Sequence, residues 1–415
     1  MRQFRIASVL ACLGLILPAC SSAPTRSPPA HYDLLIRNGA VYDGSGAAAQ
    51  SVDVAVNGDR VVALLPAGTP ASATTVIDAG GHAVAPGFIN VLSWATESLI
   101  ADGRGMSDTM QGVTLEIFGE GWSGGPLTEA MRAQALKQQS DFHFPIPWTS
   151  LGEYLEHLQQ LGITPNIASF VGATTVRIHE LGEDDVAPTP EQLSRMQDLV
   201  RAAMREGALG VGASLIYPPA FFAKTDELVA LAQAAAESGG GYVAHMRSEA
   251  DQFLPALEET ITIARATGQH AEAYHLKAAG ARNWPKMAKA VARIDQARSE
   301  GVDIAANMYA YTAGATGLTA ALPPWVQAGG HDVMIKRLKD PAIRQRVIAE
   351  MKGPAKGWEN LRELAGDDAK VLFIGFRSEA FKPLTGKTPA DVLAQRGTSP
   401  EATMLDLITE DDSRV

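Results

Sequence analysis

The sequence predicts an α/β fold in which a (β/α)8-type barrel follows a small N-terminal β-sandwich subdomain. From residue 86 onward, short apolar runs alternate with stretches of helical length, as in parallel strands joined by crossover helices. Residues 32–85 instead show short alternating strands separated by turn residues. The 415 residues, of which 46% are apolar and 20% charged, suit one large folded domain and a small accessory one.

The start of the chain indicates export. Arg2 and Arg5 precede an apolar stretch, residues 6–17, which is too short to span a bilayer. Residues 17–22 read Leu-Pro-Ala-Cys-Ser-Ser, which looks like the cleavage box of a bacterial lipoprotein. A plain secretory signal is the alternative.

We therefore expect residues 1–19 to be a lipoprotein signal peptide and Cys20 to carry the lipid. Residues 20–31, rich in Ser, Pro and Ala, are expected to form a flexible tether. The lipid would attach the protein to the membrane at the periplasmic face of the bacterial cell envelope, because several acyl chains on one cysteine give firm anchoring. The alternative signal would release a soluble periplasmic protein.

Residues 32–85 predict a small β subdomain, incomplete in itself, with two hairpins. Asn38-Gly39 and Asn57-Gly58 each separate two alternating segments, and Asn-Gly in this setting is the strongest short signal for a hairpin. The alternating segments are 33–37, 40–42, 52–56 and 60–64.

Residues 86–415 predict the barrel. Candidate strands are 87–92, 113–118, 165–171, 208–214, 241–245, 271–275 and 302–308. Helical stretches include 191–206, 226–238, 250–267, 284–299, 331–351, 389–396 and 400–410. The alternation suits a closed barrel better than an open sheet. Because only seven strands can be assigned, we expect the eighth strand to be missing and the barrel to be incomplete at its C-terminal end.

Two histidines at equivalent points of the repeat predict a metal site. His245 and His275 each follow a short apolar run, and they are 30 residues apart, about one strand-plus-helix unit. A βα repeat would therefore place them on neighbouring strand ends at the carboxyl face of the barrel. Neutral imidazoles in that position are a common way to hold catalytic zinc. The simpler alternative is two histidines that only make local hydrogen bonds.

The net charge of the chain excludes one class of partner. The formal charge is −11 at pH 7, and the sequence contains no basic cluster. Nucleic acid is therefore not expected as a partner, because no basic field is present to attract phosphates.

Motifs spread over roughly residues 32–415 carry a family resemblance. They are Val84–Ile89, Gln111–Thr114, Glu206–Gly210, Leu215–Pro219, Ala244–Glu249, His275–Lys277 and Tyr309–Gly314. Together they resemble the N-acyl-D-amino-acid deacylases, or D-aminoacylases, of the amidohydrolase superfamily. The resemblance implies a metal-dependent hydrolase barrel in which zinc activates the water that cleaves an N-acyl-D-amino acid. The expected substrate is therefore a small N-acyl amino acid or a peptide that contains a D-amino acid.

The metal ligands implied by the resemblance are only partly present. His245 and His275 match the two histidines that hold the tightly bound zinc. The first strand should end in a His-x-His pair, but Leu92 and Trp94 stand there, and neither side chain can donate to a metal. One Zn²⁺ per chain is therefore expected.

The resemblance implies a cysteine ligand at the end of the second strand, and this sequence has no cysteine there. Glu120 lies one position before the place of that cysteine, and we expect it to be the third ligand. Alternation along residues 113–120 would put Glu116 and Glu120 on the same barrel-facing side, so Glu116 is the alternative ligand. A further possibility is that Glu120 lies on an exposed loop.

Four residues near the strand ends are candidates for substrate binding. Arg247 could bind a substrate carboxylate with two hydrogen bonds, or pair with Glu249. Lys277 could orient a carboxylate or the scissile carbonyl, or be solvated. Tyr309 and Tyr311 could bind the substrate or pack beneath the loops.

The catalytic base implied by the resemblance is an aspartate in a Gly-Ser-Asp context, which we expect to lie beyond Val415 in a chain that ends early. Turnover by the 415 residues themselves is therefore in doubt. Two alternatives remain: a lipid-anchored binding protein of the same fold that does not hydrolyse its ligand, and a cyclic-amide hydrolase. Enzymes of the latter group usually carry a metal-bridging lysine on the fourth strand, and residues 209–215 contain no lysine.

Overall fold

The chain divides into two units, with the boundary between Pro86 and Gly87. The computed structural model describes residues 31–139 and 142–412. The predicted signal peptide, the lipidated Cys20 and all but the last residue of the predicted tether lie outside the described residues. Within the described ranges, no helix has the length and apolar character that crossing a membrane requires.

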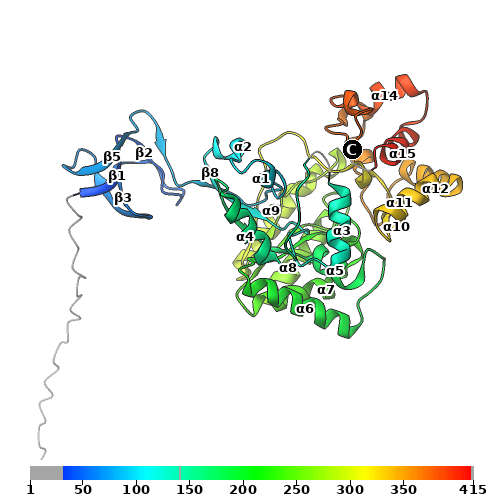
Figure 1. The fold of residues 1–415 in the computed structure, drawn as a ribbon, viewed down its shortest axis with the longest axis horizontal. Coiled ribbons are helices and arrows are strands. Elements are labelled where there is room, and N and C mark those ends of the chain that lie inside the picture. The colour runs from blue at the N-terminus through cyan, green and yellow to red at the C-terminus, as the bar shows by residue number, and fades with distance from the viewer. Residues whose placement is uncertain (1–30, 140–141, 413–415) are drawn as a thin grey trace, which may run out of the picture. The chain divides into compact units, whose positions relative to one another are not determined.

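The first unit contains one six-stranded sheet, where the sequence predicted a sandwich (Figure 1). Its strands are β1 (His31–Arg37), β2 (Ala40–Val41), β3 (Gln50–Asn57), β4 (Arg60–Pro66), β5 (Ser72–Asp78) and β6 (Ala83–Val84). The order is β5-β1-β3-β2-β6, and β4 also pairs with β3. A small core holds the sheet together, formed by Tyr32, Leu35, Ala55 and Leu65.

The two Asn-Gly pairs have different outcomes. The hairpin at Asn57-Gly58 is confirmed, because β3 and β4 pair antiparallel and Asn57 opposes Arg60. The hairpin at Asn38-Gly39 is wrong. Strands β1 and β2 do not pair with each other but follow one another along β3, and Asn38, with φ of 62°, bends the chain between them.

The second unit is built on parallel strands, as predicted for an α/β barrel. They are β7 (Phe88–Asn90), β8 (Val113–Phe118), β9 (Asn166–Ser169), β10 (Val171–Gly172), β11 (Gly210–Ser214), β12 (Gly241–His245), β13 (Ala271–Ala273) and β14 (Ile304–Ala306). They form two runs, β7-β8-β9 and β10-β11-β12-β13-β14, in which every pair is parallel. Phe170 separates β9 from β10, so these two segments continue one strand and the described chain has seven strand positions.

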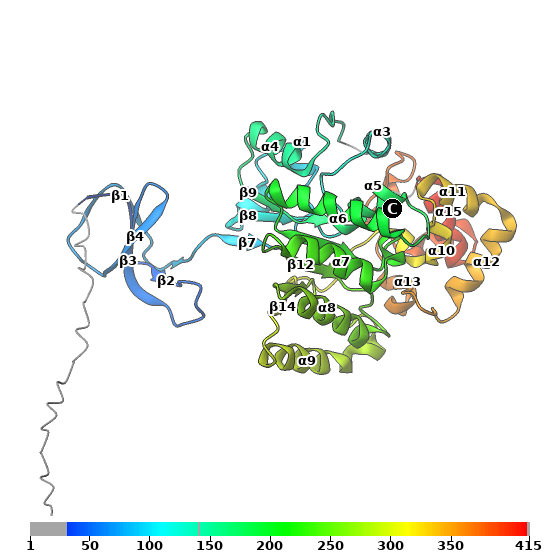
Figure 2. The same cartoon turned by 90° about the horizontal axis from the view of Figure 1, so that it is seen from below.

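Helices cover the outside of these strands (Figure 2). The helices between β7 and β14 are α1 (Ser98–Ala101), α2 (Met106–Thr109), α3 (Glu129–Gln138), α4 (Leu151–Leu161), α5 (Ala173–Leu181), α6 (Pro190–Arg205), α7 (Thr225–Ala236), α8 (Phe253–Thr267) and α9 (Met287–Ser299). Neighbouring helices from α5 to α9 contact one another in sequence order. Short 3-10 helices η1 (Ala220–Phe222) and η2 (Ala281–Lys286) lie in the loops.

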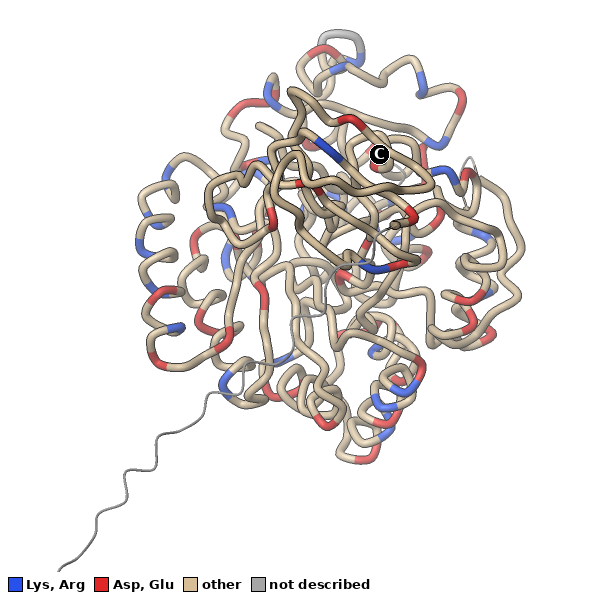
Figure 3. Tube along the Cα trace, turned by 90° about the vertical axis from the view of Figure 1, so that its left-hand side faces the viewer, with Lys and Arg blue, Asp and Glu red and all other residues tan. Residues whose placement is uncertain are grey.

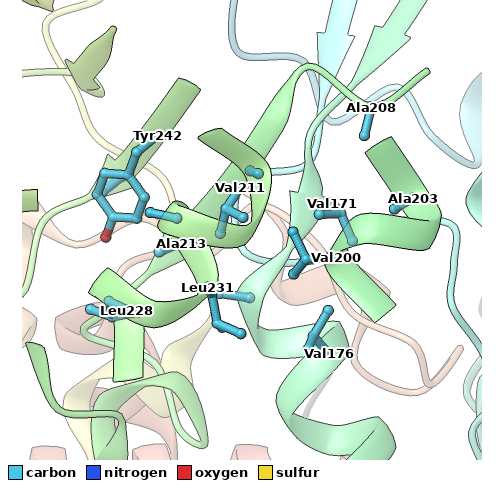
Figure 4. Close-up of a cluster of buried hydrophobic side chains, with 14 of the residues drawn as sticks. Val171, Val176, Val200, Ala203, Ala208, Val211, Ala213, Leu228, Leu231 and Tyr242 are labelled. Atoms are coloured by element: carbon cyan, nitrogen blue, oxygen red, sulfur yellow. The ribbon is translucent and has the colours of Figure 1, made fainter. Parts of the chain in front are cut away.

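The main core lies between strands β10 to β13 and helices α4 to α8 (Figure 4). Val171 and Val211 on the strands face Val200 and Leu231 on the helices, and all four are fully buried. Burying each such side chain contributes about 1.5–3 kcal/mol. A separate cluster fills the inside of the barrel, where side chains from different strand positions meet: Phe170, Val243 and Tyr274, with Leu92 and Ile117 packed against them.

Residues after β14 form a helical region of the same unit. Its elements are η3 (Leu318–Ala321), α10 (Pro324–Gln327), α11 (His331–Lys339), α12 (Pro341–Lys352), α13 (Leu361–Ala365), η4 (Asp368–Lys370), η5 (Lys382–Leu384), α14 (Pro389–Arg396) and α15 (Pro400–Glu410). Helices α11, α12 and α15 share an apolar core. Acidic and basic residues are interspersed along the helices rather than gathered by sign (Figure 3).

Candidate metal centre

Three acidic or imidazole side chains meet at one edge of the barrel. Glu120 lies two residues after β8, His245 is the last residue of β12, and His275 lies two residues after β13. Because these strands are parallel, their carboxyl ends lie at the same edge. The structure therefore brings together the three residues that the sequence singled out as metal ligands.

The three side chains are close and buried. Glu120 Oε1 lies 2.9 Å from His275 Nε2 and 3.5 Å from His245 Nδ1. The two imidazole centroids are 4.5 Å apart, and the rings are inclined at 79°. One potential ligand atom from each residue lies within 4.8 Å of the others. Glu120, at 8% exposure, is not on an exposed loop.

Two backbone positions with positive φ aim these side chains inward. In an extended strand, neighbouring residues point to opposite sides. Ile117 already packs inside the barrel, so strict alternation would turn Glu120 outward. Gly119 has φ of 103°, which interrupts the alternation just before Glu120. His275 itself has φ of 37°, and its backbone N–H donates to Asn307 Oδ1 at 2.7 Å, which holds this strained residue in place.

The predicted alternative ligand Glu116 lies on the other side of β8. Its neighbour Ile117 packs inside the barrel, whereas Phe118 belongs to the outer core with the helices. Glu116 is fully buried, accepts a hydrogen bond from Ser93 Oγ at 2.6 Å and adjoins a small hollow lined by α1 and α2 residues. The predicted barrel-facing side of β8 was therefore wrong for Glu116, and only Glu120 reaches the histidines.

A carboxylate and a lysine surround the outer nitrogen of His275. Glu249 Oε1 lies 2.8 Å from His275 Nδ1, and Lys277 Nζ lies 2.6 Å from the same Glu249 oxygen. Lys277 Nζ is also 2.9 Å from His275 Nδ1. Histidines that bind metals commonly have the second nitrogen held by a carboxylate, which fixes the ring orientation. His275 thus has one nitrogen toward Glu120 and the other toward Glu249.

The neighbours of Glu120, Glu249 and His275 favour the charged form of each side chain. Burial opposes ionisation of Glu120, but hydrogen bonds from His245 and His275 lower its pKa to about 2. Burial also opposes the charged form of His275, yet Glu120 and Glu249 raise its pKa to about 9. Glu249 is a buried carboxylate whose pKa is lowered to about 2 by the nearby imidazoles and Lys277. Two anionic carboxylates here require positive charge beside them.

These residues fit a divalent metal ion. One carboxylate and two imidazoles are ligand types that zinc prefers. His245 Nε2 is buried and makes no hydrogen bond to any described residue, although buried polar atoms are normally paired. Glu120, His245 and His275 could therefore hold one metal ion, and Glu249 would orient His275 from outside.

The structure also places Trp94 at this site, a role that sequence reasoning did not assign to it. The indole Nε1–H of Trp94 donates to Glu120 Oε2 at 2.8 Å. Trp94 stands where the resemblance implied a histidine, so the sequence indicated only that a ligand was lost. The contact joins positions 26 residues apart, and no local pattern signals it.

A cavity of about 2330 Å³ opens over the cluster. Among the predicted substrate-binding residues, Lys277, Tyr309 and Tyr311 line it. The Tyr309 ring centroid is 6.4 Å from that of His275, and Lys277 Nζ lies 5.3 Å above the Tyr309 ring. Tyr311 is 74% exposed.

Arg247 does not belong to this group. Its guanidinium makes several hydrogen bonds to Glu259, the shortest at 2.9 Å, and one to the carbonyl of Phe221. It is not among the described residues that line the cavity. The predicted pairing with Glu249 is wrong as well, because Glu249 contacts His275 and Lys277 instead.

Comparison with known proteins places this arrangement in a family. No family model matches the chain. It is 31% identical over 296 residues to a D-aminoacylase and 32% identical over 336 residues to an N-acyl-D-glutamate deacylase, both from Alcaligenes xylosoxydans xylosoxydans. These matches cover 70% and 80% of this chain, but 60% and 64% of the two relatives. The chain therefore spans less than two thirds of these relatives.

Solved structures agree with the sequence matches. An N-acyl-D-glutamate deacylase from Bordetella bronchiseptica superposes with a TM-score of 0.72 and 26% identity, over 91% of this chain and 70% of that one. The chain belongs to the amidohydrolase family that includes the D-aminoacylases. The Bordetella enzyme is described as complexed with zinc and a phosphonate that mimics the tetrahedral intermediate. A D-aminoacylase structure with a TM-score of 0.71 is described as having a binuclear metal centre, with one-metal activation and second-metal attenuation.

Proposed function

We propose that this protein is a zinc-dependent amide hydrolase that removes the acyl group from N-acyl-D-amino acids. The reaction adds water across the amide bond and gives a carboxylate and a free amino acid. The observation that carries this proposal is the convergence of Glu120, His245 and His275 at the barrel edge, in a chain of the D-aminoacylase family. We propose that these three residues hold one zinc ion per chain. When bound there, zinc supplies a water nucleophile at neutral pH and polarises the amide carbonyl.

The chain's own residues prepare the site. Glu249 Oε1 lies 2.8 Å from His275 Nδ1 and so holds the ring with Nε2 directed at Glu120. Lys277 neutralises Glu249, and its position on the cavity wall allows it to attract a substrate carboxylate. Tyr309 and Tyr311 line the cavity, and their hydroxyl groups can make hydrogen bonds to a substrate. Arg247 takes no part, since Glu259 holds it.

Metal analysis and an activity panel test the proposal together. The purified chain is expected to contain about one zinc. Any free amino acid that it releases is expected to come from N-acetyl-D-amino acids and not from the matched L-forms. His245→Ala should lose both zinc and activity. His270→Ala is the matched control, because His270 lies half-exposed before β13, outside the cavity lining, and contacts Asp303.

The other outcomes separate the alternatives. Binding of an N-acyl-D-amino acid without product would support a binding protein of the same fold. Ring opening of a hydantoin would favour a cyclic-amide hydrolase, although β11, which spans Gly210–Ser214, contains no lysine to bridge two metals. Retention of full zinc by His245→Ala would contradict the ligand assignment.

We also propose attachment to the periplasmic face of the bacterial cell envelope through a lipid on Cys20. The support is the Leu-Pro-Ala-Cys-Ser-Ser sequence after a short apolar stretch. Expressed in a bacterium, the protein should partition into detergent, and Cys20→Ser should abolish both processing and partitioning. Release of the wild-type protein in soluble form would support the secretory alternative.

A further inference from the structure

We propose that Trp94 is a positioning residue that holds Glu120 as a one-oxygen metal ligand and fills the place where a second cation would bind. This inference rests on the proposed function, because it assumes that Glu120, His245 and His275 hold a metal. It goes further, in that it assigns a role to a residue that cannot itself bind metal.

The two oxygens of Glu120 have separate partners. Oε1 faces the two imidazoles, at 2.9 Å from His275 and 3.5 Å from His245. Oε2 accepts the indole N–H of Trp94 at 2.8 Å. A hydrogen bond from a neutral donor to a buried carboxylate is stronger than one between neutral groups. The bond thus favours an orientation in which only Oε1 faces the histidines.

Hydrogen bonds hold the backbone on both sides of Trp94, and the indole, which is 55% exposed, is oriented by its bond to Glu120. Tyr274 Oη donates to the carbonyl of Val91 at 2.8 Å, and Tyr154 Oη donates to that of Thr96 at 2.9 Å. Ser93 N donates to the carbonyl of Ile117 at 2.8 Å, and Ser93 Oγ donates to Glu116. These partners come from three parts of the unit: strand β8, helix α4 and the residue after β13. Such support is what a ligand-orienting contact needs.

The chemistry of this strand end opposes a second metal. An indole N–H only donates, and a leucine side chain has no polar atom, so Trp94 and Leu92 offer no ligand. Glu120 Oε2, which could otherwise bridge to a second ion, is already occupied. A D-aminoacylase of similar fold is described as binuclear and attenuated by its second metal. We infer that Trp94 keeps this chain's centre at one ion even when metal is abundant.

Cobalt titration of the full chain tests this role. Protein stripped with a chelator is titrated with Co²⁺, and the bound ion is counted and its affinity measured against a competing chromophoric chelator. Wild type is expected to bind one Co²⁺ per chain, with no second ion at excess Co²⁺. Trp94→Phe keeps the ring but removes the N–H, and should weaken Co²⁺ binding about 10-fold. Trp284→Phe, an exposed tryptophan elsewhere on the cavity wall, should bind like wild type.

A spectroscopic readout distinguishes orientation from packing. In ¹⁵N-tryptophan-labelled protein, the indole N–H signal that disappears in Trp94→Phe should lie downfield and exchange slowly with water. Glu120→Gln should move that signal upfield, which a merely structural tryptophan would not show. Thermal unfolding of metal-free Trp94→Phe verifies that the variant is folded.

The outcomes separate this inference from the proposed function. If wild type binds one Co²⁺ and Trp94→Phe binds it equally tightly, the role of Trp94 is refuted while the metal centre stands. A second Co²⁺ on wild type also refutes it. If wild type binds no Co²⁺ at all, the proposed function fails, and the role of Trp94 fails with it.

Discussion

Glu116 and Glu120 are both buried carboxylates. Glu116 lies in β8 and Glu120 lies two residues after the end of β8, yet different side chains surround them. Glu116 faces the helices, where Ser93 is its hydrogen-bond donor and its second oxygen has no partner among the described residues. Burial raises the pKa of Glu116. Glu120 faces two imidazoles and an indole, and its pKa is lowered to about 2. Burial alone therefore does not decide the charge of a carboxylate; the side chains around it do.

The difference between the two carboxylates arises from one backbone position. Gly119 has positive φ, and a Cβ at this position would lie 2.3 Å from the carbonyl oxygen of Phe170. Only glycine fits there, and its conformation turns Glu120 to the inside of the barrel. Strand geometry thus assigns Glu116 to the packing of the fold and Glu120 to the candidate metal centre.

The largest expected effect is the loss of zinc affinity when Glu120 is neutralised, compared with the same change at Glu116. Glu120→Gln removes a proposed direct ligand and should weaken zinc binding roughly 100-fold or more, beyond what loss of a supporting contact does. Glu116→Gln, the matched control on the same strand, should bind zinc like wild type. Competition with a chromophoric chelator measures both. Equal losses in the two variants would contradict the contrast between them.

A change at Gly119 tests how the contrast arises. Gly119→Ala should destabilise the protein by about 2–3 kcal/mol, because the residue must keep a left-handed conformation and the methyl group meets a carbonyl oxygen. Zinc affinity should fall as Glu120 moves. Gly268→Ala is the control, with φ of 65° but open space around it, and should cost about 1 kcal/mol without affecting zinc. Denaturant unfolding and zinc titration give the two values, and wild-type zinc affinity in Gly119→Ala would count against this explanation.

A smaller effect is expected where a carboxylate supports the centre without binding the metal. Glu249→Gln removes the negative charge beside His275 Nδ1 and should weaken zinc binding about 10-fold. Glu258→Gln is the control, because Glu258 pairs with Arg265 and Arg293 on the exposed side of α8. Zinc titration of both variants gives the result. An unchanged affinity in Glu249→Gln would show that His275 needs no such support.

The smallest effect concerns the pH dependence of stability at Glu116. Its pKa is raised in the folded state, so its contribution is complete below the unfolded value of about 4.3 and is lost as the pH rises through the folded pKa. Glu116→Gln, which stays neutral, should therefore be more stable than wild type at pH 7. The gap should shrink toward pH 4.

Urea unfolding at a series of pH values measures this gap. A Glu116→Gln variant that is less stable than wild type by the same amount at every pH would contradict the raised pKa.

Much of the fold could be predicted from local sequence. The alternation of apolar runs and helical stretches gave the parallel strands, and the position of His245 and His275 after two such runs gave their meeting point. Asn57-Gly58 marked a true hairpin. Asn38-Gly39 did not, because a hairpin also requires the flanking strands to pair with each other, and here both pair with β3.

The parts that could not be predicted depend on contacts between distant residues. Both sides of a barrel strand are apolar, so period-two alternation in residues 113–118 cannot tell the inside from the outside. That is why Glu116 was assigned to the wrong side. The bond between Trp94 and Glu120, and that between Glu249 and His275, join residues on different strand ends and leave no local signal. Arg247 matched a motif, but Glu259 on α8 holds it.

The most direct test of the metal centre is anomalous diffraction at the zinc absorption edge from crystals of the zinc-loaded chain. We predict one anomalous peak per chain, within bonding distance of Glu120 Oε1, His245 and His275. The indole N–H of Trp94 should still donate to Glu120 Oε2. A peak elsewhere, no peak between these side chains, or a second peak beside Leu92 and Trp94 would contradict it.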